Sequence, residues 1–314
     1  MYMDKAETFY RLFPGSLREL LAAGGFCYDD LREIRLRVGQ PVLVRCGLKE
    51  STLYCRNSAV PYVIGQKELT ELINYICDYS IYAYEEEIRQ GFITVTGGHR
   101  IGIGGCVAME GASVRTFRYI TCVSIRVAHE ITGVADHILP YLFHHQRVRN
   151  TLILSSPGCG KTTLLRDVVR QISDSGQTVG VVDERSEIGG CYMGIPQNDI
   201  GRRTDIIDCC AKAQGIMMLI RSMAPDVIAV DEIGSREDAA AIGMALHSGC
   251  RLIATVHGYN IDDIAGKDGI QNLIREKALE RFVILEGRAL ENRSMKVLDM
   301  DYRCIYQSEG VSDV

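Results

Sequence analysis

The sequence predicts an α/β protein in two domains: a smaller α+β domain over residues 1–130, then a domain with a mainly parallel sheet over residues 131–314. Three observations support this prediction. Short runs that are apolar on both faces alternate with helical stretches in the second part, as in a parallel sheet covered on both sides. A glycine-rich loop there joins an apolar run to a helix. The first part holds hairpins and amphipathic helices, which are typical of an α+β unit.

The composition is that of a globular protein, with 46% hydrophobic and 24% charged residues. The net charge of -5 argues against a protein that coats nucleic acid, because such proteins carry a basic surplus. Twelve cysteines without a C-x-x-C pair indicate reduced thiols in the cytosol rather than zinc or disulfides. No apolar run approaches the roughly 18 residues of a membrane span, so we expect no transmembrane segment.

The first domain should begin with a helix over residues 4–25, followed by a strand over residues 31–38. The arginines of this strand are expected to share one face, where they meet solvent, an anion or a partner subunit. They are Arg32, Arg35 and Arg37. A second helix is predicted over residues 68–82. Gly97 and Gly98 then predict a tight hairpin turn, with His99 exposed at its tip.

The second domain contains four apolar strand candidates beyond the glycine-rich loop, each separated from the next by a helical stretch. They are Thr178–Val182, Val227–Val230, Arg251–Val256 and Phe282–Leu285. In sheets of this kind, ligands bind at the carboxyl ends of the strands. The polar residues directly after each run are therefore the candidates for chemistry.

The glycine-rich loop after Leu152–Leu154 has the pattern of a phosphate-binding P-loop. Its backbone N–H groups would wrap phosphate oxygens, Lys161 would reach the β- and γ-phosphates, and Thr162 would hold a magnesium ion. Ser155 replaces the first glycine of the pattern, which is tolerable if its φ is negative. An ordinary glycine-rich turn is the alternative interpretation. The predicted nucleotide-binding residues are Ser156, Pro157, Gly158, Cys159, Gly160, Lys161, Thr162 and Thr163.

Polar residues follow the other strand candidates. Asp231 and Glu232 follow four apolar residues, which is the Walker B pattern: Asp231 would hold the metal through its water shell, and Glu232 would accept a proton from the attacking water. His257 follows another strand and could contact the γ-phosphate, although a histidine in such a place is often satisfied locally. The acidic cluster Asp183–Glu187 could instead be the acid-rich start of a helix.

The chain resembles the stage III sporulation protein AA family, relatives of the ring-forming secretion and pilus-retraction ATPases. The resemblance covers nearly the whole chain and is specific in two blocks, Val182–Ile188 and Val230–Gly234. It implies a RecA-like P-loop NTPase domain that binds and hydrolyses ATP with Mg²⁺. Glu184 falls in the acidic segment called the Asp box, Thr255 and His257 match the end of the His box, and Arg126 resembles an arginine that reaches the nucleotide.

The resemblance also implies a biological setting. The protein would be a cytoplasmic ATPase of the mother cell, peripheral at the forespore-facing membrane. It would form a homo-oligomeric, hexameric ring and would power or assemble the channel between mother cell and forespore, with membrane-embedded channel proteins as partners. Two alternatives stay open. One is a nucleotide-switched scaffold with little hydrolysis, for which Ser155 is the support. The other is a P-loop ATPase that handles nucleic acid, a partner that the acidic balance disfavours.

Overall fold

The computed structural model describes residues 5–111, 113–288 and 291–308, and the chain divides into two compact units. The first comprises Met1–His129 with Gly190–Gln197, and the second comprises Glu130–Gly189 with Asn198–Val314. The predicted α/β class is confirmed. Residues 131–314 were predicted to form the second domain, but Gly190–Gln197 belongs to the first unit because it makes its contacts with that unit. The backbone N–H of Gly97, for example, donates to the Gln197 side-chain oxygen over 3.0 Å.

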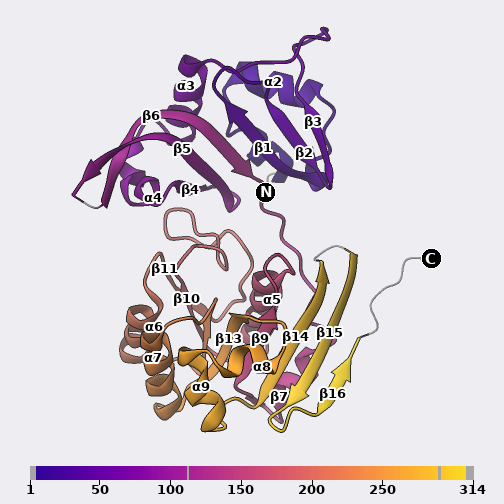
Figure 1. Cartoon of the computed structure of the whole chain (residues 1–314), viewed down its shortest axis with the longest axis vertical. Helices are drawn as coiled ribbons and strands as arrows, with labels where there is room; N and C mark the ends of the chain where they lie inside the picture. Colours follow the sequence, from indigo (N-terminus) through magenta and orange to yellow (C-terminus); the bar gives the residue numbers. More distant parts are fainter. Residues whose placement is uncertain (1–4, 112, 289–290, 309–314) are drawn as a thin grey trace. The chain divides into compact units, whose positions relative to one another are not determined.

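The first unit is built on a six-stranded antiparallel sheet in the order β3-β2-β1-β6-β5-β4 (Figure 1). Helices pack on the sheet around a core that includes Phe9, Leu36, Leu69 and Ile125, all fully buried. The strands are β1 (Leu31–Arg37), β2 (Leu43–Cys46), β3 (Lys49–Thr52), β4 (Phe92–Val95), β5 (His99–Glu110) and β6 (Ser113–Arg126). The helices are α1 (Lys5–Tyr10), α2 (Gly15–Ala23), α3 (Gln66–Ile76) and α4 (Glu85–Arg89), with short 3₁₀ turns η1 (Tyr28–Asp30) and η2 (Ile81–Tyr84).

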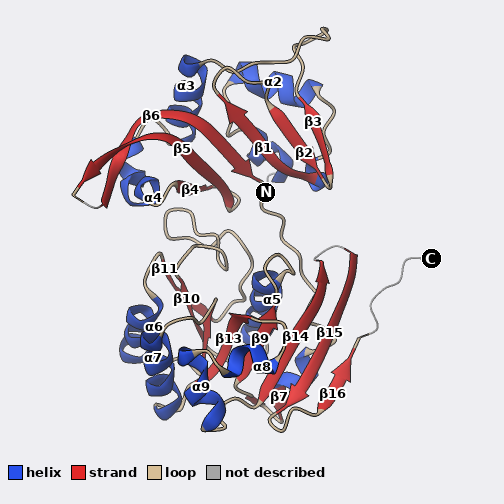
Figure 2. Ribbon diagram, viewed as in Figure 1, coloured by secondary structure: helices blue, strands red, loops and turns tan. Residues whose placement is uncertain are grey.

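The second unit is built on an eight-stranded sheet in the order β11-β10-β12-β13-β9-β14-β15-β16 (Figure 2). The strands from β11 to β14 in this order are parallel, and the last two pair antiparallel. Their bounds are β9 (Thr151–Ser155), β10 (Val179–Asp183), β11 (Thr204–Asp208), β12 (Val227–Val230), β13 (Arg251–His257), β14 (Arg281–Arg288), β15 (Glu291–Asp299) and β16 (Cys304–Gln307). A small hairpin pairs β7 (Phe143–His144) with β8 (Arg147–Val148).

The helices of the second unit bury both faces of the sheet. Alternate residues of β9 enter different cores: Ile153 packs with α5 residues such as Leu165, and Leu154 packs with α6 residues such as Ile216. This two-sided burial explains why the parallel strands read as continuous apolar runs. The helices are α5 (Lys161–Asp174), α6 (Lys212–Ser222), α7 (Arg236–His247), α8 (Ile261–Ala265), α9 (Asp268–Arg275) and the 3₁₀ turn η3 (Leu139–Leu142).

Two expectations are corrected, one about a helix and one about a single residue. The helix expected over residues 4–25 is two helices, because Pro14 precedes a new helical start at Gly15. His99 is not an exposed tip residue: it begins β5, its side chain is buried, and its Nδ1 accepts a 3.0 Å hydrogen bond from the Ala128 N–H.

Within the described residues, no helix is long and apolar enough to cross a membrane. The twelve cysteines form no disulfide there either.

Candidate functional site

The loop between β9 and α5 provides a backbone cradle. Gly158 and Gly160 have φ of 80° and 82°, values that side-chain-bearing residues rarely adopt. Ser155 is the buried last residue of β9, paired with His257 of β13, and its hydroxyl donates to the Ser156 carbonyl over 2.9 Å. The first glycine of the P-loop pattern is therefore replaced at a position where the backbone is still in the strand. Pro157, Cys159 and Thr163 complete the predicted set around this turn.

Lys161 is the first residue of α5, and its side chain meets the end of β13. Its Nζ donates to His257 Nδ1 over 3.0 Å. Burial lowers the pKa of Lys161, although the negative charges of Asp231 and Glu232 oppose that shift. A lysine held at the start of a helix, behind a loop of inward-turning N–H groups, is suited to binding phosphate oxygens.

A hydroxyl and a carboxylate meet beside Lys161. Thr162 Oγ1 donates to Asp231 Oδ2 over 2.8 Å, and the Thr255 hydroxyl donates to the other carboxylate oxygen of Asp231. Hydroxyl and carboxylate oxygens are hard donors, and Mg²⁺ is commonly held by one or two such groups together with phosphate and water. The donor set therefore fits Mg²⁺ accompanied by a nucleotide. No cluster of three or more His, Cys, Asp or Glu suited to a metal occurs among the described residues.

Glu232 directly follows Asp231 and is held in a left-handed conformation, with φ of 51°. Its backbone N–H donates to Thr255 Oγ1 over 2.8 Å, which fixes the turn. One oxygen of its carboxylate lies 3.1 Å from His257 Nε2, and the other lies 3.5 Å from an Arg185 nitrogen. Strained backbone of this kind is concentrated at functional sites, and here it aims a carboxylate at the lysine-histidine pair.

His257 therefore bridges the two charged groups. Its Nδ1 accepts from Lys161, so we assign the ring proton to Nε2, which lies 3.1 Å from a Glu232 carboxylate oxygen. Lys267 adds a second cation at this place, because its Nζ donates to the His257 carbonyl. The result is a continuous chain of polar contacts from the lysine of the loop to the candidate base.

A cavity of about 900 Å³ opens beside this chain. Glu232 and His257 line it, as does Glu184, whose carboxylate forms an ion pair with Lys212. The structure thus brings Glu184 to the same cavity as Glu232, with Lys212 as its partner. Arg126 lies at the end of β6 in the first unit, and its role toward a nucleotide stays a prediction.

A second acid of the Asp183–Glu187 cluster, Asp183, shapes the loop. The buried Asp183 carboxylate accepts hydrogen bonds from the backbone N–H groups of Glu187, Ile188 and Gly189 over 2.8–2.9 Å. The Arg166 guanidinium donates to the carbonyls of Glu187 and Ile188 over 2.6 and 2.7 Å. Burial raises the pKa of Asp183 to about 6 in spite of these N–H donors. Asp183 and Arg166 together hold this loop from both sides.

Three contacts of the site were not foreseen from the sequence. Arg185 lies within the acidic cluster but contacts Glu232, Lys212 pairs with Glu184, and Lys267 contacts His257. These lysines occur in ordinary helical or loop segments without a motif, so spacing gives no signal for them. For Arg185 a signal was available, because it is a basic residue inside an otherwise acidic cluster.

Comparison with known proteins identifies the family of this chain. A family model described as "Sporulation stage III, protein AA" matches residues 3–304. The chain belongs to this family. Stage III sporulation protein AA of Bacillus subtilis is 38% identical over 289 residues, which cover 90% of this chain and 91% of that protein. The protein SEEDLING PLASTID DEVELOPMENT 1 of Arabidopsis thaliana is 32% identical over 158 residues, 49% of this chain and 22% of that protein.

Solved structures share the fold. The ATPase DotB of Legionella pneumophila superposes with a TM-score of 0.59 at 18% identity, over 90% of this chain and 80% of DotB. The pilus retraction motor PilT, solved with bound ADP, gives a TM-score of 0.55 at 17% identity over the same fractions. At these identities the likeness establishes the secretion-ATPase fold. The functional assignment has to come from the residues of the site.

Proposed function

We propose that this chain is a Mg²⁺-dependent ATPase. One observation supports the proposal most strongly: the ends of β9, β12 and β13 bring a P-loop lysine, a metal-type Thr-Asp pair and a glutamate into one group of side chains in polar contact. These residues are Lys161, Thr162, Asp231, Glu232 and His257. Structural salt bridges do not require a strained glutamate beside a glycine cradle, whereas phosphoanhydride hydrolysis uses each of these parts.

Each residue has a separate task in this proposal. The N–H groups of the loop and the Lys161 ammonium bind the β- and γ-phosphates and offset their charge. Thr162 and Asp231 would hold Mg²⁺, which would supply charge neutralisation at the phosphates. Glu232 orients the attacking water and accepts its proton. His257 positions the Glu232 carboxylate, and it loses its contact with Lys161 when the lysine binds phosphate. Glu184 sets the polarity of the adjoining cavity.

The proposal extends to assembly and setting through family membership. The chain would act in the cytoplasm of the mother cell, peripheral at the forespore-facing membrane, as a hexameric ring. It would power or assemble the mother cell to forespore channel together with membrane-embedded channel proteins. Arg126 would contribute from the first unit to binding of the nucleotide. The domain division at residue 130 would then separate an ATPase domain from a domain that moves with the nucleotide state.

Steady-state ATP turnover against protein concentration tests this proposal, with Lys161→Ala as the blank. Turnover per subunit that rises with concentration supports an active site completed in a ring. Turnover equal to the blank at every concentration, together with absent ATP binding, would contradict the ATPase assignment.

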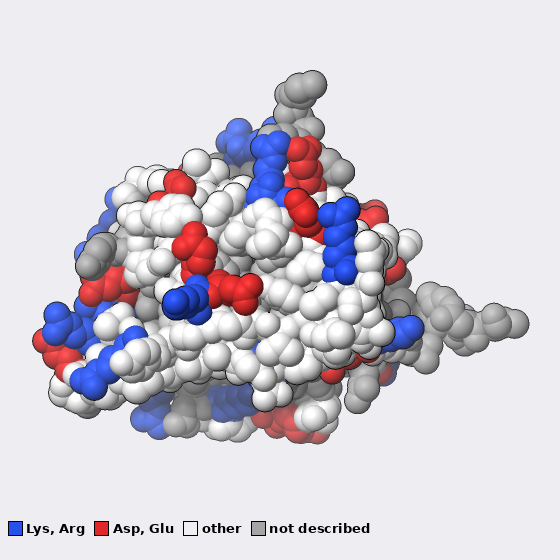
Figure 3. All heavy atoms as spheres, turned by 90° about the horizontal axis from the view of Figure 1, so that it is seen from above, with Lys and Arg blue, Asp and Glu red and all other residues white. Residues whose placement is uncertain are grey.

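A nucleotide-switched scaffold is the second candidate, and one observation favours it. Glu232 is engaged by both Arg185 and His257, so the candidate base is not free to accept a proton in this conformation. Tight ATP binding with turnover no faster than Lys161→Ala, and ATP-dependent assembly, would support the scaffold. Nucleic-acid handling gains no support on the face drawn in Figure 3, where basic and acidic side chains are interspersed.

A further inference from the structure

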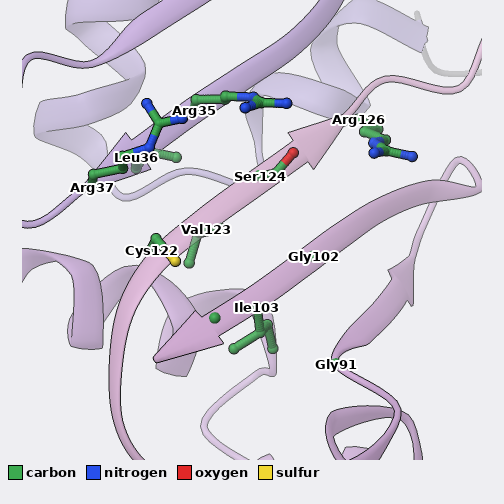
Figure 4. A pocket seen from close by; sticks show the side chains of 11 residues that line it. Arg35, Leu36, Arg37, Gly91, Gly102, Ile103, Cys122, Val123, Ser124 and Arg126 are labelled. Atoms are coloured by element: carbon green, nitrogen blue, oxygen red, sulfur yellow. The ribbon is translucent and has the colours of Figure 1, made fainter. Parts of the chain in front are cut away.

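A second pocket lies in the first unit, on a face of the six-stranded sheet, with a volume of about 290 Å³. Figure 4 shows arginine side chains from the two central strands, β1 and β6, around Ser124. Residues from β1, β6 and β5 line it, and all belong to the first unit. The residues that give the pocket its charge and shape are Arg35, Arg37, Cys122, Ser124, Arg126 and the glycines of β5. Arg32, expected on the same face, is not among the lining residues.

Glycines hollow the floor of this pocket. Gly102 of β5 pairs with Ser124 of β6, and Gly104 pairs with Cys122, so both lie in the rows of side chains that cross the sheet. A Cβ at Gly104 would lie 2.6 Å from the Cys122 sulfur, and one at Gly102 would be in contact with Ser124 at 3.8 Å. Side chains on β5 would therefore fill the space between the arginines. Two glycines spaced by two residues on one strand keep it open.

The charges around the pocket do not balance. Glu33 of β1 accepts hydrogen bonds from the Ser124 hydroxyl and from Arg35, the latter over 2.9 Å. Burial alone would raise the pKa of Glu33, but these hydrogen bonds and the nearby arginines hold it below its usual value. Glu33 therefore stays ionised and compensates one arginine. Within the part of the chain that the structure describes, no carboxylate lies within ion-pair distance of Arg37 or Arg126.

We propose that this pocket binds a dianionic phosphate group, as orthophosphate or as the phosphate of a phosphomonoester. Three guanidinium groups and one carboxylate leave a local charge of about +2, which a phosphate dianion matches. Guanidinium groups present paired N–H donors that fit phosphate oxygens. The volume of about 290 Å³ suits a phosphate group with a small substituent and lies at the low end of pockets for larger ligands.

The pocket is separate from the P-loop, because its lining comes entirely from the first unit. Arg126 is common to this proposal and to the proposed nucleotide site, so it does not distinguish the two. Arg37 and Gly102 do distinguish them, since neither has a role in the proposed ATPase reaction.

Titration of orthophosphate into the full chain, followed by calorimetry and ³¹P line broadening, tests the proposal in the Lys161→Ala background. We expect saturable binding there, because the P-loop lysine is not needed. Adding Arg37→Gln should weaken it about tenfold, since a hydrogen-bonded charge is lost. Arg45→Gln is the matched control: this exposed arginine of β2 pairs with Glu33 across the sheet and lies outside the pocket lining.

Gly102→Val tests the cavity independently of charge. Gly102 tolerates a side chain without backbone strain, so the variant should fold, keep all three arginines and lose phosphate binding by exclusion. Glycerol 3-phosphate, added to the protein with orthophosphate bound, shows which kind of ligand the pocket takes. Displacement of orthophosphate by the ester indicates a phosphomonoester ligand, and binding of orthophosphate alone indicates the free ion. Phosphate binding that is absent in Lys161→Ala, or unchanged in both Arg37→Gln and Gly102→Val, would overturn the proposal. ATP turnover of Arg37→Gln in the otherwise wild-type chain should stay unchanged, which separates this test from that of the ATPase.

Discussion

The two sheets of this protein present their polar side chains in different ways. In the eight-stranded sheet, Asp231 and His257 stand at the carboxyl ends of parallel strands, and loops with unusual backbone angles set their positions. In the six-stranded sheet, Arg35 and Arg37 lie within β1, and simple alternation places them on one face. A strand-end site depends on several loops at once, whereas a site on a sheet face depends on register. Single substitutions should therefore perturb the first site more than the second.

The polar groups also differ in how completely they are paired. At the strand ends, Lys161, Asp231 and Glu232 each have partners within the site. On the sheet face, Glu33 and Arg35 pair with each other, while Arg37 has no described carboxylate within ion-pair distance. Removing one member of a closed network leaves its neighbours without a hydrogen-bond partner. Changing one charge on an open face mainly alters what the face attracts.

The largest effect is expected from Glu232→Gln. It removes the candidate general base but keeps size and shape, so turnover should fall by about 10²–10³ while ATP binding persists. Single-turnover hydrolysis and equilibrium ATP binding measure the two quantities. Glu237→Gln is the matched control, because Glu237 lines the same cavity from the first turn of α7. Equal turnover in both variants would show that Glu232 is not the base.

The pH dependence of unfolding tests the role of Asp183 in the loop that follows β10. Its pKa in the folded state is about 6 against an ordinary 3.8, so the folded protein holds this proton more tightly than the unfolded chain. The free energy of unfolding should therefore fall as pH rises from about 4 to 6, by up to about 3 kcal/mol relative to Asp183→Asn. Urea unfolding of both proteins across this range measures the difference, and a difference that does not vary with pH would contradict the assignment.

Thr255→Val removes the hydroxyl that hydrogen-bonds to both Walker B residues, Asp231 and Glu232. The hydroxyl donates to Asp231 and accepts from the Glu232 N–H, so valine leaves both groups without this partner. We expect turnover to fall about tenfold and the free energy of unfolding to fall by about 1–3 kcal/mol. Thr255→Ser keeps the hydroxyl and should retain most of both. If serine and valine behave alike, packing of the methyl group rather than the hydrogen bonds matters here.

The same contrast explains what could be predicted from sequence. The runs Val227–Val230 and Arg251–Val256 were recognised because burial on both faces makes parallel strands continuously apolar. Three strands of the same sheet were not identified. In β11 only the two adjacent residues Ile206 and Ile207 are apolar, and an aspartate flanks them on each side. Strands β15 and β16 extend the edge of the sheet as antiparallel strands with many polar residues. A short mixed segment of this kind is not distinguished from a loop by its pattern.

Tertiary contacts limited the prediction of individual residues. His99 was expected at an exposed turn, but the strand already begins there and the Ala128 N–H requires an acceptor. Arg185 contacts Glu232 from 47 residues earlier in the chain, and Lys267 contacts His257 from 10 residues later; no local spacing encodes either contact. Motif residues such as Lys161 and Asp231 were identifiable because their chemistry requires a fixed local pattern.

The smallest effect, and the sharpest test of the sheet-face site, is expected from Glu33→Gln. The variant loses the charge that compensates Arg35, but its amide oxygen can still accept from the Ser124 hydroxyl, so stability should fall by about 1 kcal/mol. The local charge becomes more positive, and phosphate affinity in the Lys161→Ala background should rise about threefold. Because the pKa of Glu33 lies below its usual value, the ionised carboxylate and its stabilising contribution persist at neutral pH and are lost only as pH falls through that lowered pKa. Glu50→Gln on β3, outside the pocket, should leave affinity unchanged. A fall in affinity for Glu33→Gln would mean that the carboxylate orients Arg35 toward the ligand more than its charge repels it.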